Sequence, residues 1–197
     1  AQAILRKKDP RWQEILEFHD SFYIGSEVFY TFLVKNDIWW MRRRICNLNT
    51  FLEGLEGAQQ KILAGTFPDY IIHRFQSMLD YFGQSPIIVR SSSIQEDAYG
   101  NSFSGKYESI FLANQVSPIE RMQNFLNAVR KVYASSINRD ALTYRKVRGL
   151  LEHDEQMAIL VQRVSGSIYS DYFYPHIAGV GFSYNPYVWN EKIDPKS

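Results

Sequence analysis

The stretch GNSFSGKY, residues 100–107, combines glycines, small hydroxyl side chains and a lysine, which are residue types that can hold phosphate. Its two glycines and Lys106 match most of the phosphate-loop pattern G-x-x-x-x-G-K-[ST], in which the last hydroxyl binds magnesium. Tyr107 occupies that last position and cannot supply a small hydroxyl at short reach. The pattern also needs a strand directly before it, whereas the preceding apolar run ends at Val89. We therefore expect no phosphate loop of this type.

An arginine next to small residues offers another way to bind phosphate. Arg90 follows the β-branched run Ile87–Val89 directly, and a planar guanidinium pairs well with phosphate oxygens. The small residues at 91–93 and 101–105 would let backbone N–H groups approach those oxygens closely. The alternative is an ordinary hairpin with a solvated arginine, and the spacing alone does not separate the two interpretations.

The elements that must position Arg90 follow from apolar spacing and turn residues. We expect residues 1–85 to be mainly helical and residues 86–197 to form a strand-containing nucleotide-binding part, giving an α+β fold. The predicted strands are 87–89, 106–114, 157–164 and 177–186, and predicted helices start at Ser26, Thr66, Ser117 and Asn138, with Gly83 and Gly149 as stops. In residues 106–114, alternation puts Tyr107, Ser109 and Phe111 on one side.

Composition and charge narrow the classes of function. The chain has 22 basic and 21 acidic residues, so its net charge gives no reason to bind nucleic acid. Arg42–Arg44 follow Trp39 and Trp40 and could stack on bases, but we favour a helix with core tryptophans and solvated arginines. The single cysteine, Cys46, excludes a disulfide framework and a thiolate metal cluster.

The ends and the apolar runs bear on where the protein works. No apolar run approaches the length of a membrane span, and the chain opens without a signal-peptide pattern, so we expect a cytoplasmic protein. The sequence AQAILRKK starts as if within a helix, and NEKIDPKS ends in loop-like residues. We therefore expect this chain to be part of a longer protein.

Three stretches resemble the pyruvate-phosphate dikinase and phosphoenolpyruvate synthase family, in its N-terminal ATP-binding domain. PIIVRSSSIQEDAYGNSFSGKYESIFLAN contains the family's V-R-S-S, E-D and S-F-[AS]-G in that order. MAILVQRV followed by IAGVGFSYNP is similar to two strands of the family. DSFYIGSEVFYTFL, residues 20–33, is similar to the segment that leads into its early helix. The resemblance covers most of the chain, roughly residues 20–190.

The resemblance implies an ATP-grasp type of fold, incomplete here, in which two α+β lobes hold ATP between them. Carried over by motif position, Arg90 contacts the nucleotide phosphates and is the one catalytic residue implied. Gly105 and Ser109 would belong to a mobile hairpin that covers the phosphates. Gln162 would lie on the strand beside the adenine, while Lys106 falls at a variable position of the family.

The same resemblance implies ATP and Mg²⁺ as cofactors. The parent enzyme would transfer a phosphoryl group from Mg-ATP to a histidine on a separate domain, and from there to pyruvate or a related acceptor. The family's lysine segment would precede Ala1 and its metal-binding glutamate would follow Ser197. We therefore predict no metal ligand among these residues, and expect this piece alone to be inactive.

Some alternatives stay open at this point. A non-catalytic nucleotide-binding or regulatory module of the same fold would share the motifs. Glu96 and Asp97 would either orient Arg90, cap the loop or simply be solvated. Neither nucleic acid nor a membrane is an expected partner, and the oligomeric state is undetermined.

Overall fold

The computed structural model describes residues 2–15, 20–96 and 105–179. The chain forms two compact units, residues 1–164 and residues 165–197. The division that we placed after residue 85 rests on the change from helical to strand-like apolar spacing, and it stays a prediction. The two units are described separately below.

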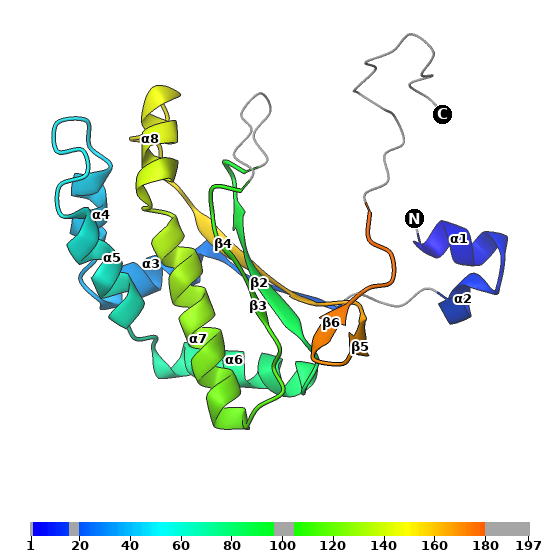
Figure 1. Cartoon of the computed structure of the whole chain (residues 1–197). Coiled ribbons are helices and arrows are strands. Elements are labelled where there is room, and N and C mark those ends of the chain that lie inside the picture. Colours follow the sequence, from blue (N-terminus) through cyan, green and yellow to red (C-terminus); the bar gives the residue numbers. More distant parts are fainter. Residues whose placement is uncertain (1, 16–19, 97–104, 180–197) are drawn as a thin grey trace, which may run out of the picture. The chain divides into compact units, whose positions relative to one another are not determined.

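A four-stranded antiparallel sheet organises the first unit (Figure 1). Its strand order is β1-β4-β2-β3. The strands are β1 (Ser21–Ile24), β2 (Ile87–Ser93), β3 (Ser109–Leu112) and β4 (Met157–Arg163). The strands at 87–89, 106–114 and 157–164 were predicted from sequence, whereas β1 was not. Residues 180–186 of the predicted strand 177–186 lie outside the described residues, and residues 177–179 are not in a strand.

Helices make up most of the remaining described residues of the first unit. They are α1 (Gln2–Lys8), α2 (Trp12–Ile15), α3 (Ser26–Lys35), α4 (Trp39–Ile45), α5 (Leu55–Ala64), α6 (Asp69–Phe82), α7 (Pro118–Ser135) and α8 (Arg139–Val147). In the second unit, β5 (Ser167–Tyr169) and β6 (Tyr172–Tyr174) pair as an antiparallel hairpin. This mixture of helices and antiparallel strands confirms the α+β class.

Three predicted helix ends are confirmed by their capping geometry. Ser117 accepts a hydrogen bond from the backbone N–H of Glu120, whose carboxylate in turn accepts from the Ser117 N–H, so α7 begins with a complete capping box. The Asn138 side chain accepts from the Ala141 N–H at the start of α8. Gly83 ends α6 with φ at 59°, a value that favours glycine.

Two predicted helix starts are wrong in their capping residue. The residue at the N-cap of α3 is Gly25 instead of Ser26, and the Glu27 carboxylate folds back over the space that a Cβ at Gly25 would fill. Thr66 does not cap α6, which begins after Pro68. The Asn36 side chain occupies both the N–H and the carbonyl of Thr66 instead.

The core lies between the helices and one face of the sheet. Ile87 and Val89 of β2 and Ile159 and Val161 of β4 are fully buried on this face. Helix α7 packs on β2, β3 and β4, and α3 packs on β4. Figure 1 shows α7 running alongside β2 and β3 on this side of the sheet. Each such buried side chain contributes about 1.5–3 kcal/mol.

The prediction for the tryptophan–arginine stretch is wrong at two positions. Trp40 is 78% exposed, whereas Arg42 is only 3% exposed. The Arg42 guanidinium pairs with Asp154 at 3.2 Å and donates to the Glu155 carbonyl at 2.8 Å. It also lies over the ring of Phe29. These partners compensate the free-energy cost of burying the Arg42 charge. The sequence pattern did not reveal that Arg42 has such partners.

Candidate functional site

Arg90 and Ser109 lie opposite each other on the face of the sheet that is turned away from the core. In β2 the side chains alternate, with Val89 and Ser91 buried and Arg90 exposed between them. The antiparallel register pairs Arg90 with Ser109 of β3, and directly opposed residues point to the same face. Two of the predicted site residues therefore come together.

Gln162 lies on the same face. The register pairs Gln162 of β4 with Ile88 of β2 and with Ser21 of β1, and the Gln162 amide donates to the Ser21 hydroxyl at 3.2 Å. Arg90 pairs with Leu160, two residues from Gln162 along β4. Such diagonal neighbours have Cα atoms about 7–8 Å apart. Arg90 and Gln162 are therefore neighbours on one surface, although 72 positions separate them in the sequence.

Apolar side chains surround these polar groups, and they were not among the predicted site residues. Tyr23 is 79% exposed and Phe111 is 67% exposed, while Ile88 and Leu160 are half-buried. We call this surface the open face, defined by Tyr23, Ile88, Arg90, Ser109, Phe111, Leu160 and Gln162. Small-molecule sites commonly combine such apolar surface with a few polar groups. No alternation in the sequence reveals this surface, because β2 begins with Ile87, Ile88 and Val89 and β4 is apolar from Met157 to Val161.

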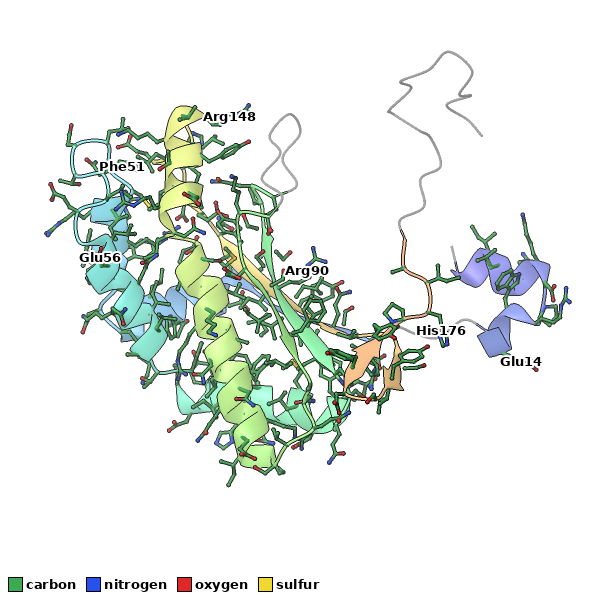
Figure 2. All side chains as sticks on the ribbon, viewed as in Figure 1. Glu14, Phe51, Glu56, Arg90, Arg148 and His176 are labelled. Carbon is green, nitrogen blue, oxygen red and sulfur yellow. The ribbon has the colours of Figure 1, made fainter. Side chains whose placement is uncertain are left out.

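Arg90 has no hydrogen-bond or ion-pair partner among the described residues, and Figure 2 shows its side chain extending from the sheet. Two other arginines of this unit are engaged. Arg42 pairs with Asp154, and Arg163 pairs with Asp20 at 3.3 Å. One detail of our prediction is wrong. Arg90 lies in the middle of β2 and not where the strand gives way to a loop, because β2 continues to Ser93.

Gly105 lies in the turn before β3 and has φ at 74°. This left-handed conformation is one that glycine adopts without strain. Residues 97–104, which include Asp97 and most of the predicted phosphate-covering hairpin, lie outside the described residues. The predicted role of Gly105 therefore stays a prediction.

Glu96 caps the end of β2 and does not contact Arg90 in the described structure. Its carboxylate accepts from the Ser91 hydroxyl at 2.7 Å and from the Ser93 backbone N–H at 2.9 Å. Tyr107 is also placed differently from our prediction, since it is only 7% exposed and belongs to the core. It precedes β3 and does not follow the alternation of Ser109.

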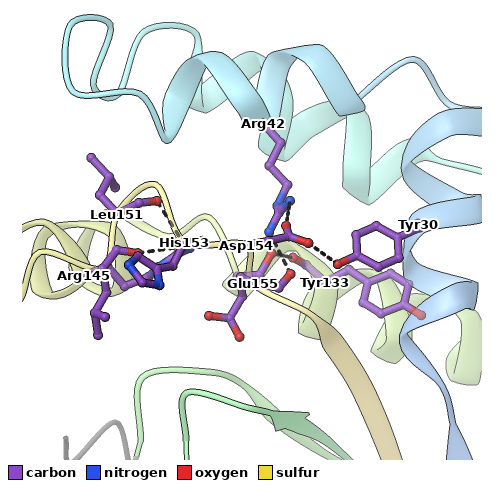
Figure 3. Close-up of polar contacts among 10 residues, drawn as sticks. Tyr30, Arg42, Tyr133, Arg145, Leu151, His153, Asp154 and Glu155 are labelled. Atoms are coloured by element: carbon purple, nitrogen blue, oxygen red, sulfur yellow. Dashed lines mark hydrogen bonds and ion pairs between the residues drawn. The ribbon is translucent and has the colours of Figure 1, made fainter. Parts of the chain in front are cut away.

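A polar cavity of about 210 Å³ lies away from the open face, among α4, α8 and the connection to β4. It is lined in part by Arg42, Arg145 and Asp154, which Figure 3 shows together. Arg42 and Arg145 already have partners, because Arg42 pairs with Asp154 and Arg145 donates to the carbonyls of Leu150, Leu151 and His153. Arg43, which also lines this cavity, is exposed. We place the candidate site on the open face because Arg90, Ser109 and Gln162 share it.

Comparison with known proteins agrees with the motifs. Residues 4–193 match the family described as the AMP/ATP-binding domain of pyruvate phosphate dikinase. The chain belongs to this family. It is also 30% identical over 146 residues to the uncharacterized phosphotransferase YvkC of Bacillus subtilis (strain 168). That match covers 73% of this chain but 16% of the relative, so the chain spans a small part of the length of that protein.

Membership of the pyruvate phosphate dikinase ATP-binding domain family raises the question of magnesium. No group of three or more His, Cys, Asp or Glu side chains with metal-binding spacing occurs within the described ranges. We derive no step through the metal. No helix in the described part of this family member is long and apolar enough to cross a membrane.

Proposed function

We propose that this chain is the ATP-binding part of a cytoplasmic phosphotransferase of the phosphoenolpyruvate synthase and pyruvate-phosphate dikinase kind. The parent enzyme would move a phosphoryl group from Mg-ATP to a histidine of a separate domain, and then to pyruvate or a related acceptor. The observation that carries the proposal is that Arg90, Ser109 and Gln162 share the open face.

The chemistry of the open face supports ATP as the ligand. Arg90, which has no partner among the described residues, offers a permanently charged planar guanidinium for phosphate oxygens. Ile88, Phe111 and Leu160 offer apolar surface against which an adenine ring can lie. Gln162, whose amide donates to the Ser21 hydroxyl, would hydrogen-bond the edge of the base.

The proposal assigns Arg90 a direct contact with the phosphates, and Arg90→Ala tests it. We expect the ATP dissociation constant of the parent enzyme to rise about tenfold or more, because a hydrogen-bonded charge pair contributes about 1.5–3 kcal/mol. Isothermal titration calorimetry measures this change. Arg74→Ala is a matched control, since Arg74 is exposed on α6, outside the sheet.

Two results would distinguish this function from its alternatives. An unchanged ATP affinity in Arg90→Ala would remove Arg90 from the site. A parent enzyme that binds ATP through Arg90 but never phosphorylates its own histidine would be a non-catalytic nucleotide-binding or regulatory module instead.

A further inference from the structure

The polar cavity of about 210 Å³, away from the open face, has no role in the proposed function. It lies among α4, α8 and the connection that leads to β4, and arginine, histidine and asparagine side chains line it. These side chains donate hydrogen bonds, and guanidinium groups in particular pair strongly with oxyanions. The composition of the cavity wall therefore favours a small anion as its ligand.

Arg145 of α8 places a buried positive charge in the wall of this cavity, where it is 1% exposed. Its Nη2 atom donates to the carbonyls of Leu150, Leu151 and His153, whereas Nε and Nη1 have no hydrogen-bond partner among the described residues. No carboxylate of the described residues, that of the buried Glu155 included, lies within ion-pair distance of this guanidinium. Burying a charge without an opposite charge is costly, so an anion bound beside Arg145 would stabilise it.

Arg43 of α4 adds a second positive charge to the same wall, and this one is exposed. It has no hydrogen-bond or ion-pair partner among the described residues, whereas the guanidinium of Arg42 pairs with Asp154 and donates to a backbone carbonyl. The next residue, Arg44, is also exposed but does not line the cavity. The guanidinium of Arg43 is therefore available to a ligand in the cavity, and Arg44 carries the same charge outside it.

Two carboxylates also line the cavity, and they differ in how strongly they would oppose an anion. Asp154 pairs with Arg42 at 3.2 Å and accepts a hydrogen bond from the Tyr30 hydroxyl, so its charge is already compensated. Glu152 is exposed, and among the described residues it accepts a long hydrogen bond of 3.3 Å from the Asn47 amide. Because the lining arginines outnumber the lining carboxylates, the excess charge of the wall is positive.

We propose that this cavity binds a small oxyanion of the phosphate type, at a site separate from the open face. Arg43 lines it from α4, Arg145 from α8, and His153 from the connection to β4. Figure 3 shows Arg145 and His153 together in the segment that precedes β4. Donors from three elements suit a tetrahedral phosphate, whose oxygens point in several directions, better than a planar carboxylate. The proposal does not depend on where ATP binds.

Isothermal titration calorimetry of the complete parent enzyme with inorganic phosphate tests the proposal. Every protein in the series carries Arg90→Ala, so that Arg90 cannot bind the phosphate, and sodium chloride keeps the ionic strength constant. We expect Arg43→Ala to raise the phosphate dissociation constant about tenfold, because a charge-assisted hydrogen bond is lost. The matched control Arg44→Ala should leave the constant unchanged. Glu152→Gln should lower it, because this variant removes a negative charge from the cavity wall.

Cys46 allows a second measurement that is local to the cavity. It is the single cysteine of this chain, it is half-buried, and it lines the cavity. Bound phosphate should slow the alkylation of Cys46 by iodoacetamide, an uncharged reagent, and mass spectrometry of the peptide that contains Cys46 measures the rate. At one phosphate concentration, we expect this protection in Arg44→Ala and its loss in Arg43→Ala.

Three results would overturn the proposal. The first is the absence of phosphate binding at millimolar phosphate. The second is an equal loss of affinity in Arg43→Ala and Arg44→Ala, which would show only a diffuse attraction to the basic residues of α4. The third is a Cys46 alkylation rate that does not change with phosphate, which would place the anion elsewhere. None of these measurements uses ATP, so failure of the proposed function would leave this test intact.

Discussion

At the scale of single residues, the arginines of this unit differ in whether their guanidinium groups already form hydrogen bonds or ion pairs within the chain. Arg42 and Arg145 are buried, and their guanidinium groups bond carboxylate or carbonyl oxygens of the chain. Arg90 is exposed and has no such partner among the described residues. An unengaged guanidinium keeps its full hydrogen-bonding capacity for a ligand. This difference distinguishes Arg90 from Arg42 and Arg145, which line the polar cavity.

Gly105 allows a stability prediction at the same scale. Its φ is 74°, and a Cβ built there meets nothing within 4 Å. Gly105→Ala should therefore cost only the backbone strain, about 1 kcal/mol of unfolding free energy. Gly105→Asn should cost less, because asparagine tolerates this conformation better. Urea unfolding of the three proteins measures the order, and an alanine variant as stable as the wild type would contradict the assigned conformation.

At the scale of elements, sequence patterns predicted β2, β4 and α7 because their signals are local. The β-branched run that starts β2 and the capping box of Ser117 need only neighbouring residues. β1 was missed because it has four residues and depends on pairing with β4, far along the chain. The burial of Arg42 depends on Asp154, 112 positions away, so no local pattern could reveal it.

The motifs predicted the candidate site residues Arg90, Ser109 and Gln162, but not the surface that they share. That surface required the register of β2 with β3 and β4. The apolar residues of the open face were overlooked because an exposed Phe111 and a core Ile110 look alike in a strand pattern. Helices α7 and α3 determine which face of the sheet is covered. Their packing on the sheet could not be predicted from the sequence.

Asp154 contacts both α3 and α4, and we predict that removing its carboxylate destabilises the fold. Asp154→Asn removes the carboxylate that pairs with Arg42 and accepts from Tyr30. We expect a loss of about 2 kcal/mol at neutral pH, less than for a fully buried pair because Asp154 is 42% exposed. Asp80→Asn, on the exposed side of α6, should have little effect. Urea unfolding of both variants measures the difference.

The same variant has a predicted pH dependence. Partial burial raises the pKa of Asp154, but the Tyr30 hydrogen bond and the Arg42 charge outweigh it and lower the pKa below 3.8. A depressed folded-state pKa contributes stability above the unfolded pKa, which is lost as the pH falls through the folded value. The stability gap between wild type and Asp154→Asn should therefore be constant above about pH 5 and shrink below it. A gap that widens in acid would contradict this pairing.

At the scale of the whole molecule, the first unit has one sheet face covered by helices and another that carries the candidate site residues Arg90, Ser109 and Gln162. The sequence neighbours Ile87 and Ile88 lie on opposite faces, as do Leu160 and Val161. In each pair, one side chain lies on the covered face and its neighbour lies on the open face, at nearly the same position along the strand. A ligand such as ATP that binds on the open face should therefore affect Ile88 and Leu160 more than Ile87 and Val161.

Methyl NMR of the isoleucine, leucine and valine side chains during titration with ATP tests the central claim most directly. The account predicts that the methyl signals of Ile88 and Leu160 shift most. The signal of Ile45, buried within α4, should remain unchanged. The shifts at Ile88 and Leu160 should become smaller in Arg90→Ala at the same ATP concentration. Unchanged Ile88 and Leu160 signals at millimolar ATP would contradict the assignment of the open face as the nucleotide site.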